Sequence, residues 1–247
     1  MRASQKFFVG LQDVGDGDRI SNKALIEALS NAANVHGKMV GQSTGEKDIS
    51  HLSWVVLNWK LAVYKRIPAC DIFEVVTWGQ AYRGLQAGRD YDIFSSSGEL
   101  IAQATSNWVA INPETGRPIK LTPEQIAGYE MEKGKLNFPD FSFTKTAPDL
   151  PFVCGCDFHV LKSMIDMNGH VHNASYIDIA QEVMPEGLDQ VLFDDIEVCY
   201  RKEIKPDETV ALEFLSDGKT HCVIIKDKAD GSVHALILMK DLKQSEA

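Results

Sequence analysis

A run of polar residues at positions 166–170 could hold and polarise a carbonyl group. Asp166, Asn168 and His170 stand at every second position, and an apolar helical run follows them. In an extended segment, residues two apart point to the same side, so we expect these three side chains to converge. The helix that follows would present free backbone N–H groups and the positive end of its dipole to the same place. The spacing therefore indicates a polar site at the start of a helix.

A second segment could bring a carboxylate to this site. Residues 200–204 have the sequence Tyr-Arg-Lys-Glu-Ile, which we interpret as a strand that carries Glu203. Cys199 shares the side of that predicted strand with Glu203 but lies four residues away. We therefore expect Glu203, and not a cysteine, to carry the chemistry.

Each of these residues also has a common structural role. Asp166 and Asn168 are residue types that form turns and cap helices. A single histidine such as His170 is more often a satisfied structural residue than a catalyst, and a single Glu203 is more often a solvated strand residue. The functional interpretation depends on their combination, because three groups alternate onto one face and a fourth follows in a second segment.

Motifs of several other enzyme classes are absent from the sequence. It contains no Gly-x-Ser-x-Gly elbow of serine hydrolases, no phosphate-binding loop and no Gly-x-Gly-x-x-Gly fingerprint. His170 and His172 with Asp166 could be considered as metal ligands, but residues 170 and 172 would point to opposite sides of an extended segment. The sequence therefore favours acid–base chemistry without a bound metal.

The two segments resemble the motifs of the acyl-acyl-carrier-protein (acyl-ACP) thioesterases, here in the form of bacterial relatives of the plant enzymes. In that family an Asp-x-Asn-x-His run leads into a helix and is followed by a Tyr-Arg-x-Glu strand, and both motifs are complete here. Residues 20–33 look like the family's first helix, and 64–68, 71–78 and 106–112 look like its first-half strands. The resemblance implies tandem hotdog domains, each a long helix wrapped by a curved antiparallel β-sheet.

The resemblance also implies a reaction and a set of roles. The reaction is hydrolysis of the thioester of fatty acyl-ACP to free fatty acid, which ends chain elongation in fatty acid biosynthesis. Glu203 would be the general base or a direct nucleophile, Asn168 and His170 would position the carbonyl or the water, and Asp166 would orient that pair. Backbone N–H groups near 173–175 would stabilise the oxyanion. No metal or organic cofactor is required, and acyl carrier protein is the expected partner.

A helix followed by antiparallel strands is predicted twice along the chain. The first helix spans 21–36 with Ser21 as its N-cap, and the second begins at an N-cap Asn173 and ends before Pro185. First-half strands are expected at 52–64, 72–85, 89–95 and 100–111. Second-half strands are expected at 190–204, 209–215, 221–227 and 233–242. This repeated order predicts an α+β fold.

The domain prediction divides the chain by chemistry. We expect an N-terminal hotdog domain at 1–140 that binds the acyl chain and a catalytic C-terminal hotdog domain at 151–247. A proline-rich stretch at 113–150 would be an ordered connector, with a short helix at 123–132. All tryptophans lie in the first half, at Trp54, Trp59, Trp78 and Trp108. Each is an ordinary core residue by itself, but together they favour an apolar acyl site there, where the family reads chain length.

Composition excludes several other functions. The chain has 247 residues and a net charge of −10, which disfavours nucleic acid as a partner. No apolar run could cross a bilayer and the first residues lack an apolar signal core, so we expect a cytoplasmic protein without a membrane partner. The five cysteines fit no disulfide framework. Cys154, Cys156 and His159 give only three possible ligands where a structural zinc uses four, so free thiols are favoured.

Other interpretations stay open at this point. A hotdog-type acyl-CoA thioesterase, a hydroxyacyl dehydratase and a non-enzymatic acyl-binding protein would share the fold. Docking of an acidic carrier protein to this acidic chain would need a local basic cluster. The candidates are Lys65, Arg66, Arg201, Lys202 and Lys205, of which Lys205 is the best placed. We expect either a monomer, as a pseudo-dimer of hotdog units, or a homodimer.

Overall fold

A computed structural model of the chain describes residues 1–42 and 53–242. The first half contains β1 (Arg2–Phe8), α1 (Asn22–Met39), β2 (Ser53–Val63), β3 (Ile72–Arg83), β4 (Gln86–Ser95) and β5 (Leu100–Ile111). A short helix α2 (Pro123–Ile126) follows. The second half contains β6 (Phe152–His159), α3 (Ser175–Gln181), β7 (Asp195–Tyr200), β8 (Thr209–Ser216), β9 (Thr220–Asp227) and β10 (Val233–Lys240). Short 3₁₀ turns lie at Leu11–Asp13, Asp16–Asp18, Ala127–Tyr129 and Lys162–Met164.

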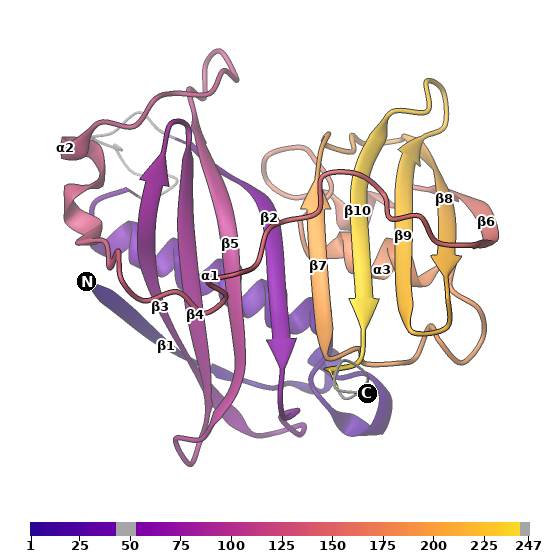
Figure 1. The fold of residues 1–247 in the computed structure, drawn as a ribbon, viewed down its shortest axis with the longest axis horizontal. Helices are drawn as coiled ribbons and strands as arrows, with labels where there is room; N and C mark the ends of the chain where they lie inside the picture. The colour runs from indigo at the N-terminus through magenta and orange to yellow at the C-terminus, as the bar shows by residue number, and fades with distance from the viewer. Residues whose placement is uncertain (43–52, 243–247) are drawn as a thin grey trace.

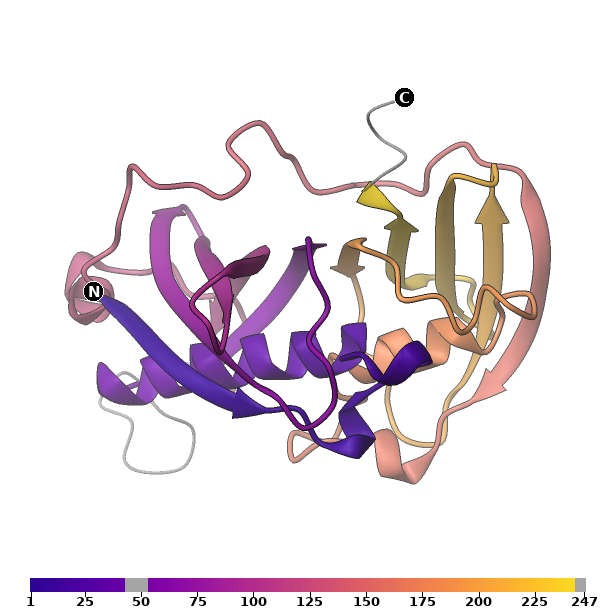
Figure 2. The same cartoon turned by 90° about the horizontal axis from the view of Figure 1, so that it is seen from below.

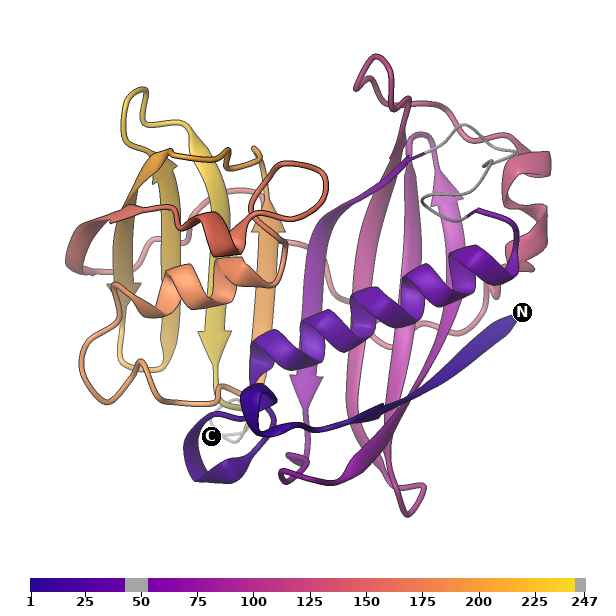
Figure 3. The same cartoon turned by 180° about the vertical axis from the view of Figure 1, so that it is seen from behind.

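The strands of both halves form one continuous antiparallel sheet (Figure 1). Its order is β1-β3-β4-β5-β2-β7-β10-β9-β8-β6, so β2 and β7 join the two halves at the centre. Helices α1 and α3 lie on the same face of the sheet (Figure 3), and each half of the sheet curves around its helix (Figure 2). Within the described residues, no helix combines the length and the apolarity that spanning a membrane requires.

Helix α1 begins where the sequence predicts it. The Ser21 hydroxyl accepts a hydrogen bond from the backbone N–H of Ala24 at 3.1 Å, which caps one of the free donors at the helix start. Gly41, just beyond the helix end, has a φ of 78°, a conformation that glycine adopts without strain. Helix α3 differs from the prediction, because its N-cap is Ala174 and not Asn173.

The two helices share one hydrophobic core. Leu25 and Leu29 of α1 and Ile179 and Ala180 of α3 are all buried in the same cluster of apolar side chains. At the surface, the Lys23 ammonium of α1 lies 2.6 Å from a carboxylate oxygen of α3, that of Asp178. Because the sheet is continuous as well, the chain folds as two similar units with a common interior.

Most predicted elements are confirmed, with three differences besides the start of α3. The strand expected at 190–204 is only β7, since the residues on both sides of it leave the sheet. Strands β1 and β6, which precede the helices, were not predicted. The helix expected at 123–132 is shorter, with α2 followed by a 3₁₀ turn. Leu52, the first residue of one predicted strand, lies outside the described residues. The α+β architecture itself is confirmed.

The proline-rich connector crosses the face of the sheet opposite the helices (Figure 1). The backbone N–H of Asn137 donates to the Asp90 carboxylate at 3.0 Å, and the Thr144 hydroxyl donates to Glu197 at 2.9 Å. Further along, Arg201 donates to the carbonyl of Thr144 at 2.6 Å. Residues of the connector thus form hydrogen bonds with both halves of the sheet.

Candidate active site

The polar run at 166–170 forms a tight turn and not an extended segment. Ile165 and Val171 form an isolated antiparallel bridge at its base, and Gly169 within it has a φ of 81°. The prediction of an extended segment is therefore wrong, because a chain that doubles back over so few residues does not alternate its sides. Figure 3 shows this turn on the helix side of the sheet, between the two halves of the molecule.

The Asp166 carboxylate organises the turn. One oxygen accepts from the backbone N–H of Asn168 at 2.8 Å and from that of His170 at 3.5 Å. The other oxygen accepts from the side-chain amide of Asn168 at 3.2 Å. Aspartate commonly binds backbone N–H groups a few residues ahead in this way. The turn thus brings the three predicted site residues together. The predicted extended segment would also have brought them together, by placing their side chains on one side.

Glu203 lies in a loop and not on a strand, contrary to prediction. The last pair of β7 with β10 joins Tyr200 to Ala235, and residues 201–208 then leave the sheet. Pro206 lies in this loop, and Asp207 has a positive φ of 61°, so the chain cannot continue the ladder. The argument that placed Cys199 and Glu203 on one side of a strand therefore has no basis.

The loop is nevertheless fixed against the turn and α3. The backbone N–H of Ile204 donates to the hydroxyl of Tyr176 at 3.1 Å, while the carbonyl of Ile204 accepts from the N–H of Val171 at 2.9 Å. Ile204 itself is fully buried. The residue next to Glu203 is thus held by a helix on one side and by the polar turn on the other.

These contacts bring Glu203 and His170 together. The Nε2 atom of His170 lies 3.1 Å from a carboxylate oxygen of Glu203, and the Lys205 ammonium lies 3.8 Å from the other oxygen. The side chains of His170 and Glu203 are 37% and 49% exposed, so water and a substrate can reach the pair. A carboxylate next to an imidazole is a common acid–base unit in catalysis.

The start of α3 is less open to a ligand than the sequence suggested. The backbone N–H of Ala174 donates to Nδ1 of His172 at 3.4 Å, and that of Ser175 donates to the His172 carbonyl at 2.9 Å. Two of the three amides expected to stabilise an oxyanion are therefore already engaged. His172, which the sequence offered beside His170 as a metal ligand, instead stabilises the start of this helix.

Cys199, the cysteine nearest to Glu203 in the sequence, is not arranged to act as a nucleophile. Cys199 is buried and its thiol donates to Glu197 at 3.3 Å. Burial, followed by the negative charge of Glu197, raises the pKa of the Cys199 thiol, so it stays protonated and a poor nucleophile. Across residues 1–42 and 53–242, no group of three or more His, Cys, Asp or Glu side chains is arranged to hold a metal ion.

A cavity of about 300 Å³ lies in the first half, between the C-terminal end of α1 and the sheet. Its lining includes Trp54, Ala87, Arg89, Trp108, Tyr129 and Met131. Two of the four tryptophans therefore line a cavity, while Trp59 and Trp78 are completely buried. Beneath it, Arg89 lies 2.9 Å from Nδ1 of His36, and burial, assisted by Arg89, lowers the pKa of His36 to about 4.

Some residues of the site were not predicted from the sequence. Tyr176 was not predicted as a residue of the site, but its hydroxyl holds the Glu203 loop. His234, buried behind that loop, was not predicted at all. The only signal for His234 is a single polar ring within the apolar strand β10. Lys205 was predicted as a docking residue but also contacts Glu203.

The architecture, two helices each wrapped by half of a curved antiparallel sheet, is that of tandem hotdog units. Residues 2–129 match the description "Acyl-ACP thioesterase N-terminal domain", and residues 155–238 match "Acyl-ACP thioesterase C-terminal domain". The chain belongs to the acyl-ACP thioesterase family.

Individual relatives agree with this assignment. Oleoyl-acyl carrier protein thioesterase 2 of Arabidopsis thaliana is 30% identical over 83% of this chain and 60% of its own length. Dodecanoyl-[acyl-carrier-protein] hydrolase of Cinnamomum camphora is 26% identical over 89% of this chain and 61% of its own length. The chain thus spans about 60% of the length of these plant relatives.

Solved structures show the same fold at low sequence identity. The 12:0-ACP thioesterase from Umbellularia californica has a TM-score of 0.82 and 21% identity, over 97% of this chain and 96% of that one. An acyl-ACP thioesterase from Bacteroides thetaiotaomicron has a TM-score of 0.82 and 22% identity, over 97% of both chains. The predicted tandem hotdog fold is confirmed.

Proposed function

We propose that this protein hydrolyses the thioester of fatty acyl-ACP and releases free fatty acid, which ends elongation of the chain. The observation that carries the proposal is the 3.1 Å contact between His170 and Glu203, formed by two motifs of this family that lie far apart in the sequence. The Arabidopsis and Cinnamomum relatives are named as thioesterases or hydrolases of acyl carrier protein substrates.

In the proposed mechanism, Glu203 is the general base. Its carboxylate takes a proton from water, which attacks the thioester carbonyl. The resulting tetrahedral intermediate then expels the thiolate of the carrier's arm, and this thiolate takes the proton from Glu203. His170 orients the carboxylate and the water, and the amide of Asn168 faces the carbonyl oxygen as a hydrogen-bond donor. Asp166 holds Asn168 through the two hydrogen bonds described above. In the alternative mechanism, Glu203 attacks the thioester carbonyl directly as a nucleophile.

The acyl tail is proposed to occupy the first-half cavity. Its aromatic and apolar walls suit a hydrocarbon chain, and it lies apart from the polar turn and loop. Ala87→Leu would shorten the space available and should shift the released acids toward shorter chains. Exchanging residues 1–140 with those of a relative of different preference tests the same idea, because product length should follow the exchanged part. Product length that follows the second half would contradict it.

The function is tested with a ladder of acyl-ACP substrates of increasing chain length. We expect free fatty acid and free carrier protein in equal amounts, and faster turnover than with the corresponding acyl-coenzyme A. Comparable or faster turnover of acyl-coenzyme A would favour the alternative thioesterase class. Conversion of a hydroxyacyl thioester to the enoyl product, without release of acid, would indicate a dehydratase. Binding without turnover of any of these substrates would indicate an acyl-binding protein.

The remaining expectations about the protein's surroundings stay predictions. Acyl carrier protein is the proposed partner, and a cytoplasmic location and a monomeric or dimeric state follow only from the sequence. Gel filtration with light scattering measures the oligomeric state directly.

A further inference from the structure

A buried histidine lies directly behind the loop that carries Glu203. His234 is completely buried at the start of β10, where the register between β9 and β10 shifts between Val233 and Ala235. A bulge of this kind turns a side chain out of its usual direction, and such bulges are frequent beside active sites. The bulge occurs where β10 stops pairing with β7, at the point where the Glu203 loop begins.

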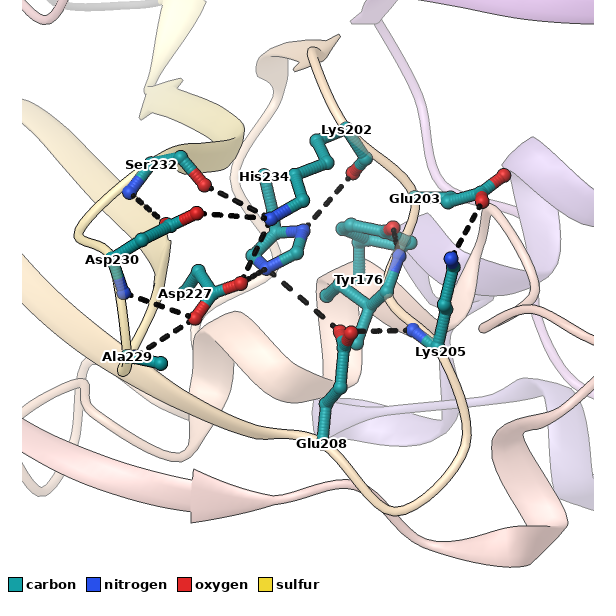
Figure 4. A network of polar contacts seen from close by, with 11 residues as sticks. Tyr176, Lys202, Glu203, Lys205, Glu208, Asp227, Ala229, Asp230, Ser232 and His234 are labelled. Carbon is teal, nitrogen blue, oxygen red and sulfur yellow. Dashed lines mark hydrogen bonds and ion pairs between the residues drawn. The ribbon is translucent and has the colours of Figure 1, made fainter.

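His234 holds the loop at Lys202, the residue before Glu203. Its Nδ1 lies 3.2 Å from the carbonyl oxygen of Lys202 (Figure 4). A carbonyl only accepts hydrogen bonds, so Nδ1 carries the proton and donates it. The backbone carbonyl of His234 in turn accepts from the N–H groups of Arg201 and Lys202, at 2.8 and 3.2 Å. The side-chain contact of His234 is therefore added to backbone hydrogen bonds that already hold the start of the loop.

The other edge of the imidazole faces negative charge. Nε2 of His234 is buried without a hydrogen-bond partner, and it lies 3.9 Å from Asp227 and 4.0 Å from Glu208 (Figure 4). The hydrogen bond from Lys202 lowers the pKa of Asp227 to about 2, so this carboxylate is ionised at neutral pH. Glu208 also accepts from the backbone N–H of Lys205 at 3.0 Å. The ring thus lies between Asp227, which binds Lys202, and Glu208, which belongs to the loop and binds Lys205.

The side chain of Lys202 is held as well. Its ammonium lies 2.8 Å from Asp227 at the end of β9, and 3.1 Å from the Ser232 hydroxyl and 3.6 Å from Asp230 in the turn between β9 and β10. Glu203 therefore follows a residue that is fixed by its backbone and by its side chain. Ile204, the next residue, is fixed by Tyr176 and by the polar turn, as described above. Only the Glu203 side chain extends free of these contacts toward His170.

We infer that His234 is a positioning residue: by binding the Lys202 carbonyl, it fixes the backbone of the 201–208 loop and holds the Glu203 carboxylate against His170. The consequence for turnover depends on the proposed function, whereas the consequence for the loop does not. A shift of about 1 Å at a catalytic group can cost on the order of 10²-fold in rate. Loss of the His234 contact should therefore lower turnover without changing how the acyl chain binds.

Three substitutions separate the two edges of the ring. His234→Asn keeps a donor near the position of Nδ1, His234→Gln keeps one near Nε2, and His234→Phe keeps the ring but removes both nitrogens. We expect His234→Phe and His234→Gln to lower kcat by about 10-fold or more with KM nearly unchanged, and His234→Asn to stay within about 3-fold of the wild type. If His234 served only to pack the core, His234→Phe should instead keep more activity than His234→Asn and His234→Gln.

Amide hydrogen exchange measures the loop without reference to activity. Peptides that cover 201–208 should exchange faster in His234→Phe and His234→Gln than in the wild type, and at nearly wild-type rates in His234→Asn. The matched control is His221→Phe, since His221 is a buried histidine of β9 that packs on Phe193 and Phe214, away from the loop. It should change neither kcat nor exchange in the loop.

The outcomes distinguish this inference from the proposed function. Wild-type kcat together with wild-type loop exchange in His234→Phe overturns the inference. If that variant does not fold, equal kcat and equal loop exchange in the asparagine and glutamine variants overturn it instead. If the wild-type protein hydrolyses no acyl thioester, the proposed function fails, while loop exchange still decides whether His234 positions the loop.

Discussion

Two loops in equivalent places of the two halves have similar sequences and different roles. Residues 64–71 follow β2 and begin Tyr-Lys-Arg, whereas residues 201–208 follow Tyr200 at the end of β7 and begin Arg-Lys-Glu. Both contain a proline a few residues further on. Because β2 and β7 are antiparallel neighbours, the two loops lie at opposite ends of the sheet.

In the first loop, the charged group is largely buried and structural, with the Arg66 side chain only 11% exposed. The Arg66 guanidinium donates to the Asn22 side chain at 2.7 Å and to the carbonyls of Leu192 at 3.1 Å and Phe193. Burial lowers the pKa of Arg66 to about 10, although Asp194 at 3.7 Å opposes this shift. Arg66 thus ties the start of α1 to the segment before β7, across the two halves.

In the second loop, the corresponding charge is at the surface and the next residue is the proposed general base. Lys202, which follows its tyrosine at the same distance as Arg66, is 41% exposed and binds the β9–β10 turn. Glu203 beside it is half exposed and contacts His170. In the first loop, the Arg66 charge lies among backbone carbonyls and stabilises the fold. In the second loop, the Glu203 carboxylate instead faces the His170 imidazole and solvent, where it is accessible to a substrate.

The largest expected effect concerns Glu203. Glu203→Gln should lower kcat by about 10²-fold or more, the usual scale for loss of a general base, without a change in thermal stability. Turnover of acyl-ACP and a melting curve measure the two parts. Cys199→Ser is the control and should retain activity when folded. Normal turnover in Glu203→Gln would show that the second loop takes no part in the reaction. The proposed difference between the two loops would then be wrong.

The next effect is the converse substitution in the first loop. Arg66→Met should reduce the free energy of unfolding by about 3 kcal/mol, because it leaves several buried acceptors without a donor. Lys65→Met, which removes only an exposed pair with Glu99, should change stability by less than about 1 kcal/mol. Urea unfolding of both variants gives the comparison. Equal stability of the two would show that burial does not distinguish the loops.

A third prediction concerns His36, a buried histidine of the first half. His36 has a pKa of about 4 in the folded protein, below its ordinary value, so the unfolded chain binds a proton at a higher pH than the folded one does. Lowering the pH from 7 to 5 therefore favours unfolding, and His36 alone should reduce stability by about 2 kcal/mol. Urea unfolding at both pH values tests this. In His36→Gln this part of the pH dependence should disappear; an unchanged dependence would contradict the prediction.

The sequence predicts the architecture better than the geometry of the site. The helix N-cap at Ser21 and most strands follow from local patterns, and both are confirmed. Strands β1 and β6 were missed because they lie before the helices, outside the predicted order of helix and then strands. The alternation of side chains that is typical of a strand was also predicted for residues 166–170 and 200–204, but the chain turns in both segments.

The site residues themselves were selected from their motif and not from their conformation. Hydrogen bonds within the 166–170 turn bring Asp166, Asn168 and His170 together, and the contact of His170 with Glu203 adds a residue from a second segment. Contacts such as that between Ile204 and Tyr176 join residues far apart in the sequence, so local patterns contain no signal for them. For the same reason, His234 could be identified only from the fold.

The smallest expected effect concerns the carrier protein and the lysines of the two loops. Lys205 is 60% exposed and lies 3.8 Å from Glu203, at the mouth of the proposed site. A charge reversal there would also repel Glu203, so the neutral variant Lys205→Met is the cleaner test. Since exposed charges act mainly on association and are screened by salt, Lys205→Met should raise KM for acyl-ACP by about 3-fold and leave kcat nearly unchanged.

Higher ionic strength should likewise raise the KM of the wild type for acyl-ACP, but should have little effect on its KM for acyl-coenzyme A or short thioesters. Lys65→Met, in the loop at the other end of the sheet, is the matched control and should leave KM unchanged. Equal salt sensitivity for carrier-bound and small substrates would show that no basic docking patch operates at the second loop.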